Sequence, residues 1–212
     1  MKNKKTELIK RPSTVLCLFI LLMSLILPGC GYNTLVTLDE GVNQAWSQVE
    51  NQYQRRADLI PNLVKTVQGA ADFEKSVLTE VTEMRSRVGQ MKLSADDLSD
   101  PQKFEAYQKA QDQLSGVLSR LLVVAENYPQ IKSNENFKSL QDQLEGTENR
   151  IANERKKFNE AVQEYNTKIR SFPTLITAKI FGFKEKQYFK SIPGSEKTPD
   201  VNIDFNKKKD SK

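Results

Sequence analysis

Charged and amide side chains interrupt two stretches of the sequence whose spacing otherwise predicts apolar helix faces. The first is QRRADLIPN, residues 54–62, and the second is LEGTENRIANERKKFNE, residues 144–160. Polar groups at core positions need hydrogen-bond partners, because burying them unpaired is unfavourable. They form either a buried network that fixes helix register or a polar groove that binds a ligand or a partner's tail. With a third polar site at residues 126–127, the candidates are Arg55, Arg56, Asp58, Asn62, Glu126, Asn127, Glu148, Asn149 and Arg155.

Carboxylates are the candidates for catalysis, since a pair such as Glu126 and Glu148 is the minimum for glycoside hydrolysis. The chain has no histidine, which removes the commonest general base and metal ligand and the Glu-x-x-His pattern of di-metal helical proteins. It also has no glycine-rich phosphate loop and no nucleophile elbow. We therefore predict a protein that is not an enzyme and that has no metal or cofactor.

The two cysteines, Cys17 and Cys30, both lie near the N-terminus, so no disulfide or Cys/His zinc site is expected within the domain. A basic segment precedes an apolar run from Val15 to Leu27, the order found in signal peptides. As a helix this run would reach about 20 Å, which is short of the roughly 30 Å hydrocarbon core of a bilayer. Residues 1–29 are therefore predicted to be a signal peptide.

The run ends in LPGC, residues 27–30, which resembles the lipobox of bacterial lipoproteins. The resemblance implies that Cys30 is acylated, for example with palmitate, and becomes the mature N-terminus. Gly31 is not the aspartate associated with inner-membrane retention, so the implied location is the periplasmic side of the outer membrane where a cell has two membranes. The alternative is an uncleaved signal anchor, which makes a single-pass inner-membrane protein. Both place the domain outside the cytoplasm.

Apolar residues recur at steps of three or four from residue 42 to 67, which predicts one face of a long helix. The stripe extends back to Leu35, and Asn33 or Thr34 is a suitable N-cap. Pro61 predicts a bend near Leu59 or Ile60, because proline removes a helix hydrogen bond. The stripe consists of Val42, Trp46, Val49, Tyr53, Ala57, Ile60, Val64 and Val67.

Three further apolar series cover residues 73–91, 104–128 and 137–172. The last two each stop directly before a proline, Pro129 or Pro173, which disfavours helix in the preceding residue. Three or four long amphipathic helices joined by short turns predict an all-α fold, an antiparallel bundle over residues 30–190. Residues 174–189 either cap one end of the bundle or form an apolar patch that meets a partner or a membrane. Residues 191–212 are predicted to be a disordered tail.

Two long segments resemble the LemA family of bacterial envelope proteins. They are YNTLVTLDEGVNQAWSQVENQYQRRADLIPNLVKTV, residues 32–67, and the stretch from AYQKAQDQL to YNTKIRSFP, residues 106–173. The resemblance covers about residues 32–189. It implies an N-terminal membrane anchor followed by an all-helical domain, and the family carries no settled biochemical activity.

The net charge of +5 does not indicate a nucleic-acid partner. Residues 1–29 hold five basic residues and one acid, which is +4 of the total, so the remainder carries only +1. We therefore predict a membrane-tethered helical scaffold or adaptor of the cell envelope that binds an unidentified envelope protein. The alternative is a protein that binds a small ligand or peptide through a polar groove.

Overall fold

The computed structural model describes residues 12–69 and 73–190, with side chains from residue 31 onward. Every regular element in these ranges is helical, so the predicted all-α class is confirmed for this part of the chain. The first eleven residues and the tail predicted at 191–212 lie outside the described residues, as does the side chain of Cys30. The elements are α1 (Pro12–Gln68), α2 (Lys75–Gln90), the short 3₁₀ helix η1 (Asp96–Ser99), α3 (Pro101–Ala125), α4 (Pro129–Lys132), α5 (Glu135–Arg170) and α6 (Thr174–Phe181).

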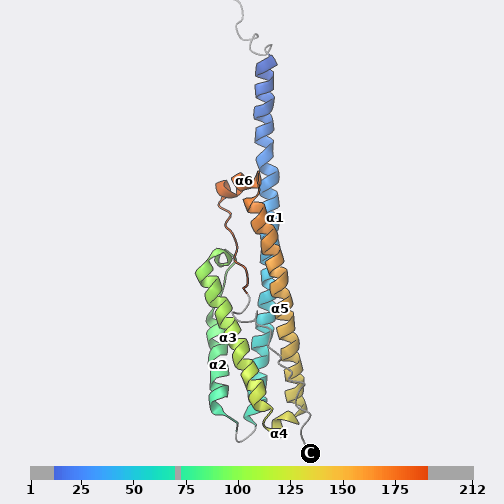
Figure 1. Ribbon diagram of the computed structural model, residues 1–212, viewed down its shortest axis with the longest axis vertical. Coiled ribbons are helices and arrows are strands. Elements are labelled where there is room, and N and C mark those ends of the chain that lie inside the picture. The colour runs from blue at the N-terminus through green and yellow to red at the C-terminus, as the bar shows by residue number, and fades with distance from the viewer. Residues whose placement is uncertain (1–11, 70–72, 191–212) are drawn as a thin grey trace, which may run out of the picture.

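The long helices lie lengthwise along a common axis (Figure 1). Helix α5 packs along α1, and α2 packs along α3. The colours in Figure 1 show that consecutive long helices run in opposite directions, with the short α4 at one end and α6 at the other. The N-terminal part of α1 extends past α6, away from the other helices.

Two apolar clusters fill the space between the helices. The aromatic core surrounds Trp46, whose ring lies 5.5 Å from that of Phe158 and 5.6 Å from that of Tyr107, measured between centroids. The aliphatic core lies toward α4 and includes Leu114 and Leu118 of α3. Most of the predicted stripe of α1 is buried, although Arg56 and Leu63 face the interior where Ala57 and Val64 were expected.

Local signals account for most helix ends. Asp100 caps α3 by accepting hydrogen bonds from the amides of residues 102 and 103, and Pro101 takes the first helical position. Asn134 caps α5 in the same way. The ends predicted before Pro129 and Pro173 are confirmed, since α3 stops at Ala125 and α5 at Arg170.

One local expectation for α1 needs revision. The N-cap predicted at Asn33 or Thr34 is wrong, because α1 begins at Pro12 and the Asn33 carbonyl already accepts a hydrogen bond from Thr37 Oγ1 within the helix. Contacts of residues 31 and 32 with α6 support this turn. Pro61 does not end the helix, which continues to Gln68; the bend near residues 59–60 stays a prediction.

Pro61 nevertheless affects how α2 packs against α1. A proline has no N–H, so the carbonyl of the residue four positions earlier, Ala57, lacks its usual helical donor. Arg85 of α2 supplies a replacement, because its Nε donates to the Ala57 oxygen at 3.0 Å. This contact ties α2 to α1 at the proline.

Candidate functional site

A cluster of polar side chains lies between the two apolar cores, where α1, α3 and α5 face one another. We call it the polar layer; its members are Tyr53, Arg56, Gln111, Asp112, Ser115, Glu148 and Arg155. Arg56 of α1 is its centre and has no solvent exposure. Its Nη1 donates to Glu148 Oε1 of α5 at 2.9 Å, and Nη2 donates to the backbone and side-chain oxygens of Gln111 on α3. One guanidinium therefore joins three helices.

Ser115 completes this half of the polar layer. Its hydroxyl accepts from Arg56 Nη1 and donates to Glu148 Oε2 at 3.2 Å. Within the described residues Arg56 Nε makes no hydrogen bond, and the guanidinium carbon lies 5.2 Å from the centroid of the Tyr53 ring. The arginine is thus held by a carboxylate, an amide, a hydroxyl and an aromatic face, a combination that compensates for removing its charge from water.

Arg155 of α5 forms the other half. Its Nε donates to the Tyr53 hydroxyl at 2.7 Å and its Nη2 to Asp112 Oδ1 at 2.8 Å. The same guanidinium lies 4.8 Å from the centroid of the Phe189 ring, close enough for a cation–π contact. Arg155 consequently connects α1 and α3 to the last described segment of the chain.

Burial and neighbouring groups shift the pKa values of Tyr53 and Arg155. It raises the pKa of the Tyr53 hydroxyl far above its ordinary value, although the two arginines work against the shift. Burial disfavours the charged form of Arg155, but Tyr53 and Asp112 more than offset this, so the pKa of Arg155 is raised. At neutral pH the tyrosine stays neutral and Arg155 stays cationic, which preserves the hydrogen-bond directions described above.

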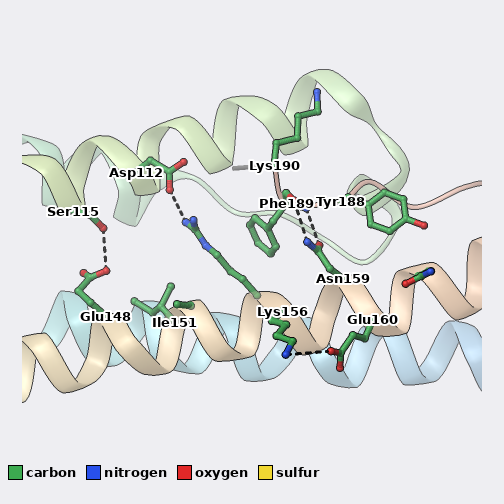
Figure 2. A pocket seen from close by; sticks show the side chains of 13 residues that line it. Asp112, Ser115, Glu148, Ile151, Lys156, Asn159, Glu160, Tyr188, Phe189 and Lys190 are labelled. Atoms are coloured by element: carbon green, nitrogen blue, oxygen red, sulfur yellow. Dashed lines mark hydrogen bonds and ion pairs between the residues drawn. The ribbon is translucent and has the colours of Figure 1, made fainter. Parts of the chain in front are cut away.

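An open groove lies beside the polar layer, between α3, α5 and the chain after α6 (Figure 2). Its volume is about 790 Å³. Asp112 and Ser115 line it from α3, and Glu148 and Arg155 line it from α5. The side chain of Phe189 lies between these two helices (Figure 2). The side chain of Glu148 is 35% exposed, so this carboxylate reaches both the buried arginine and the solvent.

The segment after α6, which we call the C-terminal strap (residues 183–190), is held in place by side-chain amides. Asn166 donates to the Lys186 carbonyl at 2.9 Å and accepts from the Lys186 amide at 3.0 Å. Asn159 likewise donates to the carbonyl of Phe189 and accepts from its amide. Gln108 makes the same pair of hydrogen bonds with the backbone of Lys190. These amides replace the partner strand that an extended chain usually requires.

The structure brings together only three of the predicted site residues, Arg56, Glu148 and Arg155. Asp58 accepts a hydrogen bond from Gln54 at 2.8 Å, and Glu126 takes the C-cap position of α3. Asn149 borders a smaller hollow beside Ser119 and Glu145. The residues that lie exposed, away from the Arg56 cluster, are Arg55, Asp58, Asn62, Glu126, Asn127 and Asn149.

Sequence reasoning missed Tyr53, Gln111, Asp112 and Ser115 as members of the layer. Gln111 carried the usable signal, because a glutamine occupies a position in the apolar stripe of α3. Chemically the layer offers carboxylate oxygens balanced by guanidinium groups. Among the residues whose side chains are described, no three acidic, cysteine or histidine side chains cluster where they would hold a metal ion.

Comparison with known proteins gives one family and three relatives. The model of the LemA family matches residues 45–205. Two relatives are the magnetosome proteins MamQ 1 and MamQ 2 of Paramagnetospirillum magneticum, each 30% identical over 181 residues, which cover 78% of this chain and 66% of the relative. Magnetosome protein MamQ of Magnetospirillum gryphiswaldense is 29% identical over 181 residues, which again cover 78% of this chain and 66% of the relative. The chain thus spans just under two thirds of the length of these relatives.

Proposed function

The chain belongs to the LemA family, and on this premise we propose that it is a membrane-tethered helical scaffold of the bacterial cell envelope that acts by binding another protein. One observation carries the proposal: α1 is continuous from Pro12 to Gln68, so a tether at Cys30, or in the apolar segment before it, is attached to a helix of the packed domain itself. A tether built in this way fixes the direction of the domain as well as its location.

The proposed tether is a lipid on Cys30, which becomes the mature N-terminus when residues 1–29 are removed. This cysteine directly precedes Gly31, where α6 packs on α1. In a cell with two membranes the domain then lies on the periplasmic side of the outer membrane. The alternative tether is the uncleaved run from Val15 to Leu27 in the inner membrane. Within the described part of the chain, no helix combines the length and the hydropathy of a membrane span.

The proposed scaffold is one antiparallel bundle that projects from the membrane. From Gly31 to Gln68, α1 extends about 55 Å at roughly 1.5 Å per residue. The polar layer ties α1 to α3 and α5 at Arg56, which is nearer to Gln68 than to Gly31, and so fixes the register of the three helices. The relatives named as magnetosome proteins support a role at a membrane-associated assembly. The proposed partner is an envelope protein that docks along the exposed helix faces.

The tether is tested by growing cells with a radioactive fatty acid and fractionating their membranes. We expect the wild-type chain and Cys17→Ala to be labelled and Cys30→Ala to lose both the label and membrane retention. Cys17 is the matched control, because it lies in the segment that processing removes. Full-length, unlabelled chain that remains in the membrane would replace the lipid tether with the signal anchor.

The scaffold role is tested by photo-crosslinking in cells, with the crosslinker placed in turn on exposed positions of α2, α3 and α5. We expect one envelope protein to be captured repeatedly from neighbouring positions, and from the wild-type chain but not from Cys30→Ala. An unrelated lipoprotein carrying the same crosslinker is the control. If this chain and the unrelated lipoprotein capture the same set of proteins, the scaffold proposal is contradicted.

Binding of a small ligand or peptide is the second candidate, and the groove of about 790 Å³ favours it. A ligand that donates hydrogen bonds would meet Glu148 and Asp112. Ligands that bind the folded state raise its melting temperature, so the full chain should be screened by thermal shift. A true ligand of the groove should stabilise wild type and Glu145→Gln but not Glu148→Gln. A screen without any such ligand counts against this candidate.

A further inference from the structure

Helix α6 presents an apolar face to solvent. Ile176 and Ile180 are four residues apart, so they lie on one side of this helix, and Phe172 lies in the turn that precedes it. Phe172 is 81% exposed, Ile180 is 72% exposed, and Phe181 is 56% exposed. With the partly exposed Tyr32 of α1 these residues form what we call the α6 surface: Tyr32, Phe172, Ile176, Ile180 and Phe181. Nothing among the described residues covers it.

The opposite face of α6 is firmly seated. Thr174, Thr177 and Ala178 are buried. A Cβ on Gly31 would lie 3.3 Å from Thr177 Oγ1, so the helix packs directly on the backbone of α1. The ring of Tyr32 lies 4.7 Å from that of Phe181 between centroids. The exposed apolar face is therefore a fixed feature of the fold.

The place of this surface in the molecule indicates what covers it. Helix α6 crosses α1 at Gly31, one residue after Cys30, and there α1 leaves the other helices (Figure 1). Beyond that point the sequence of α1 is the apolar run from Val15 to Leu27. With either tether described above, the bilayer begins where α6 lies.

We propose that the α6 surface rests on the lipid bilayer, with its apolar side chains in the boundary between headgroups and acyl chains. The inference rests on the proposed tether, which brings the surface to the membrane, and adds that α6 is a second, non-covalent contact with lipid. Short amphipathic helices bind membranes in this way through apolar burial combined with basic flanking residues.

The charges around α6 fit an anionic lipid surface. Arg170, Lys179 and Lys184 are exposed near the apolar face, whereas Glu185 is the exposed acid in residues 170–185, with Oε1 3.8 Å from Arg170 Nε. The local balance is therefore positive, and basic side chains beside a membrane are attracted to anionic headgroups.

Fluorescence quenching in lipid vesicles tests the contact. The full, lipidated chain is added to vesicles of phosphatidylglycerol and phosphatidylcholine. The phosphatidylcholine carries bromine atoms near the headgroup end of its acyl chains. One variant carries Ile180→Trp, and its matched control carries Val123→Trp, another exposed apolar position, on α3. The native Trp46 is 3% exposed and serves as the reference, so its emission is subtracted. Circular dichroism confirms that both variants are folded.

We expect brominated lipid to reduce the emission added by Ile180→Trp about twofold or more, and to leave Val123→Trp and wild type unchanged. Replacing phosphatidylglycerol with neutral lipid should weaken the quenching. If the chain floats with the vesicles but brominated lipid quenches the two introduced tryptophans equally, the α6 contact is overturned and the tether still stands. Chain that does not float overturns the tether, and the inference with it. Emission of Ile180→Trp that depends on protein concentration but not on bromine indicates a second copy on this surface, which also overturns the inference.

Discussion

The middle of the molecule and its α6 end reverse the usual distribution of side chains. In the polar layer a fully buried arginine, Arg56, is surrounded by partners from two other helices. At the α6 end, five apolar side chains that would ordinarily be buried are partly or largely exposed. The polar layer finds its partners within the chain, whereas nothing among the described residues covers the α6 surface.

The two regions therefore have different physical consequences. A buried ion pair contributes little when intact, but removing one partner leaves an uncompensated charge or polar group, which is strongly unfavourable. An exposed apolar side chain can be replaced with little effect on folding, because its surroundings are already solvent. Mutations in the polar layer should act on stability, and mutations on the α6 surface should act on association.

The largest effect is expected at Arg56. Arg56→Ala leaves Glu148, Gln111 and Ser115 without their shared donor, and we expect it to lower the free energy of unfolding by roughly 3–5 kcal/mol. The adjacent Arg55 is exposed, so Arg55→Ala is the matched control and should change stability by less than about 0.5 kcal/mol. Urea denaturation measures both. Equal, small losses would show that the polar layer contributes nothing to stability.

The C-terminal strap should be next in sensitivity. Asn166→Ala removes both hydrogen bonds to the backbone of Lys186. We expect a loss of roughly 2–3 kcal/mol, because a buried N–H and C=O are left unpaired, and faster hydrogen exchange across residues 183–190. Asn153→Ala, on the exposed face of the same helix, is the control. Unchanged exchange in the strap would contradict the role given to Asn166.

Tyr53 makes the polar layer sensitive to high pH. Below pH about 10 its hydroxyl is protonated in both the folded and the unfolded chain. Burial raises its pKa in the folded state, so above that pH the unfolded chain binds fewer protons and stability falls as pH rises. Tyr107 and Tyr165, whose pKa values are also raised by burial, act in the same direction.

Tyr53→Phe should lower stability by about 1–2 kcal/mol at pH 7, since it removes the acceptor for Arg155 Nε. Its stability should then fall less steeply than that of wild type above pH about 10. Tyr188→Phe, on the rim of the groove, controls for loss of an exposed hydroxyl. Denaturation curves measured across this pH range show how steeply the stability of each variant falls with pH. Equal slopes for wild type and Tyr53→Phe would show that Tyr53 does not cause the pH dependence.

Arg85 and Pro61 should be coupled. Arg85→Ala removes the donor for the Ala57 carbonyl and should lower stability by about 1 kcal/mol. In a Pro61→Ala background the new backbone N–H can serve that carbonyl, so the same substitution should have a smaller effect. A double-mutant cycle measures the difference. An additive result would show that Arg85 does not compensate for the proline.

The smallest effect on folding is expected on the α6 surface. Ile180→Ser should change the free energy of unfolding by less than about 0.5 kcal/mol, because Ile180 is largely exposed. Leu121→Ser is the comparison, since Leu121 is fully buried in the aliphatic core and its loss should be several kcal/mol. Thermal denaturation compares them. A large loss at Ile180 would mean that the α6 end is part of the core.

Much of the fold follows from local sequence signals. The periodic stripes predicted long helices. The start of α3 at Asp100 and Pro101 is set by a cap, which depends only on residues close in sequence. The start of α1 was misplaced, since the helical turn at residues 31–35 is supported by contacts with α6, which lies far away in the sequence. The side-chain amides that hold the strap had no recognisable local pattern.

The polar layer marks the limit of sequence reasoning on the site. Arg55 and Arg56 are neighbours of the same type, and a stripe of period 3.6 fits either of two adjacent positions. Only the packing of α3 and α5 against α1 decides that Arg56 points inward while Arg55 remains in solvent. The same packing selects Glu148 rather than Glu126 as the partner of the buried arginine.

The sequence by itself therefore determined the family, the all-helical class and the approximate extents of the long helices apart from the start of α1, because these depend on periodicity and on residues close along the chain. The tertiary structure decided which polar residues are buried together and how amide side chains hold the strap. It also decided that α6 exposes apolar residues beside the start of the tether. Those features depend on contacts between helices far apart in sequence, whose rotation and register no single stripe can specify.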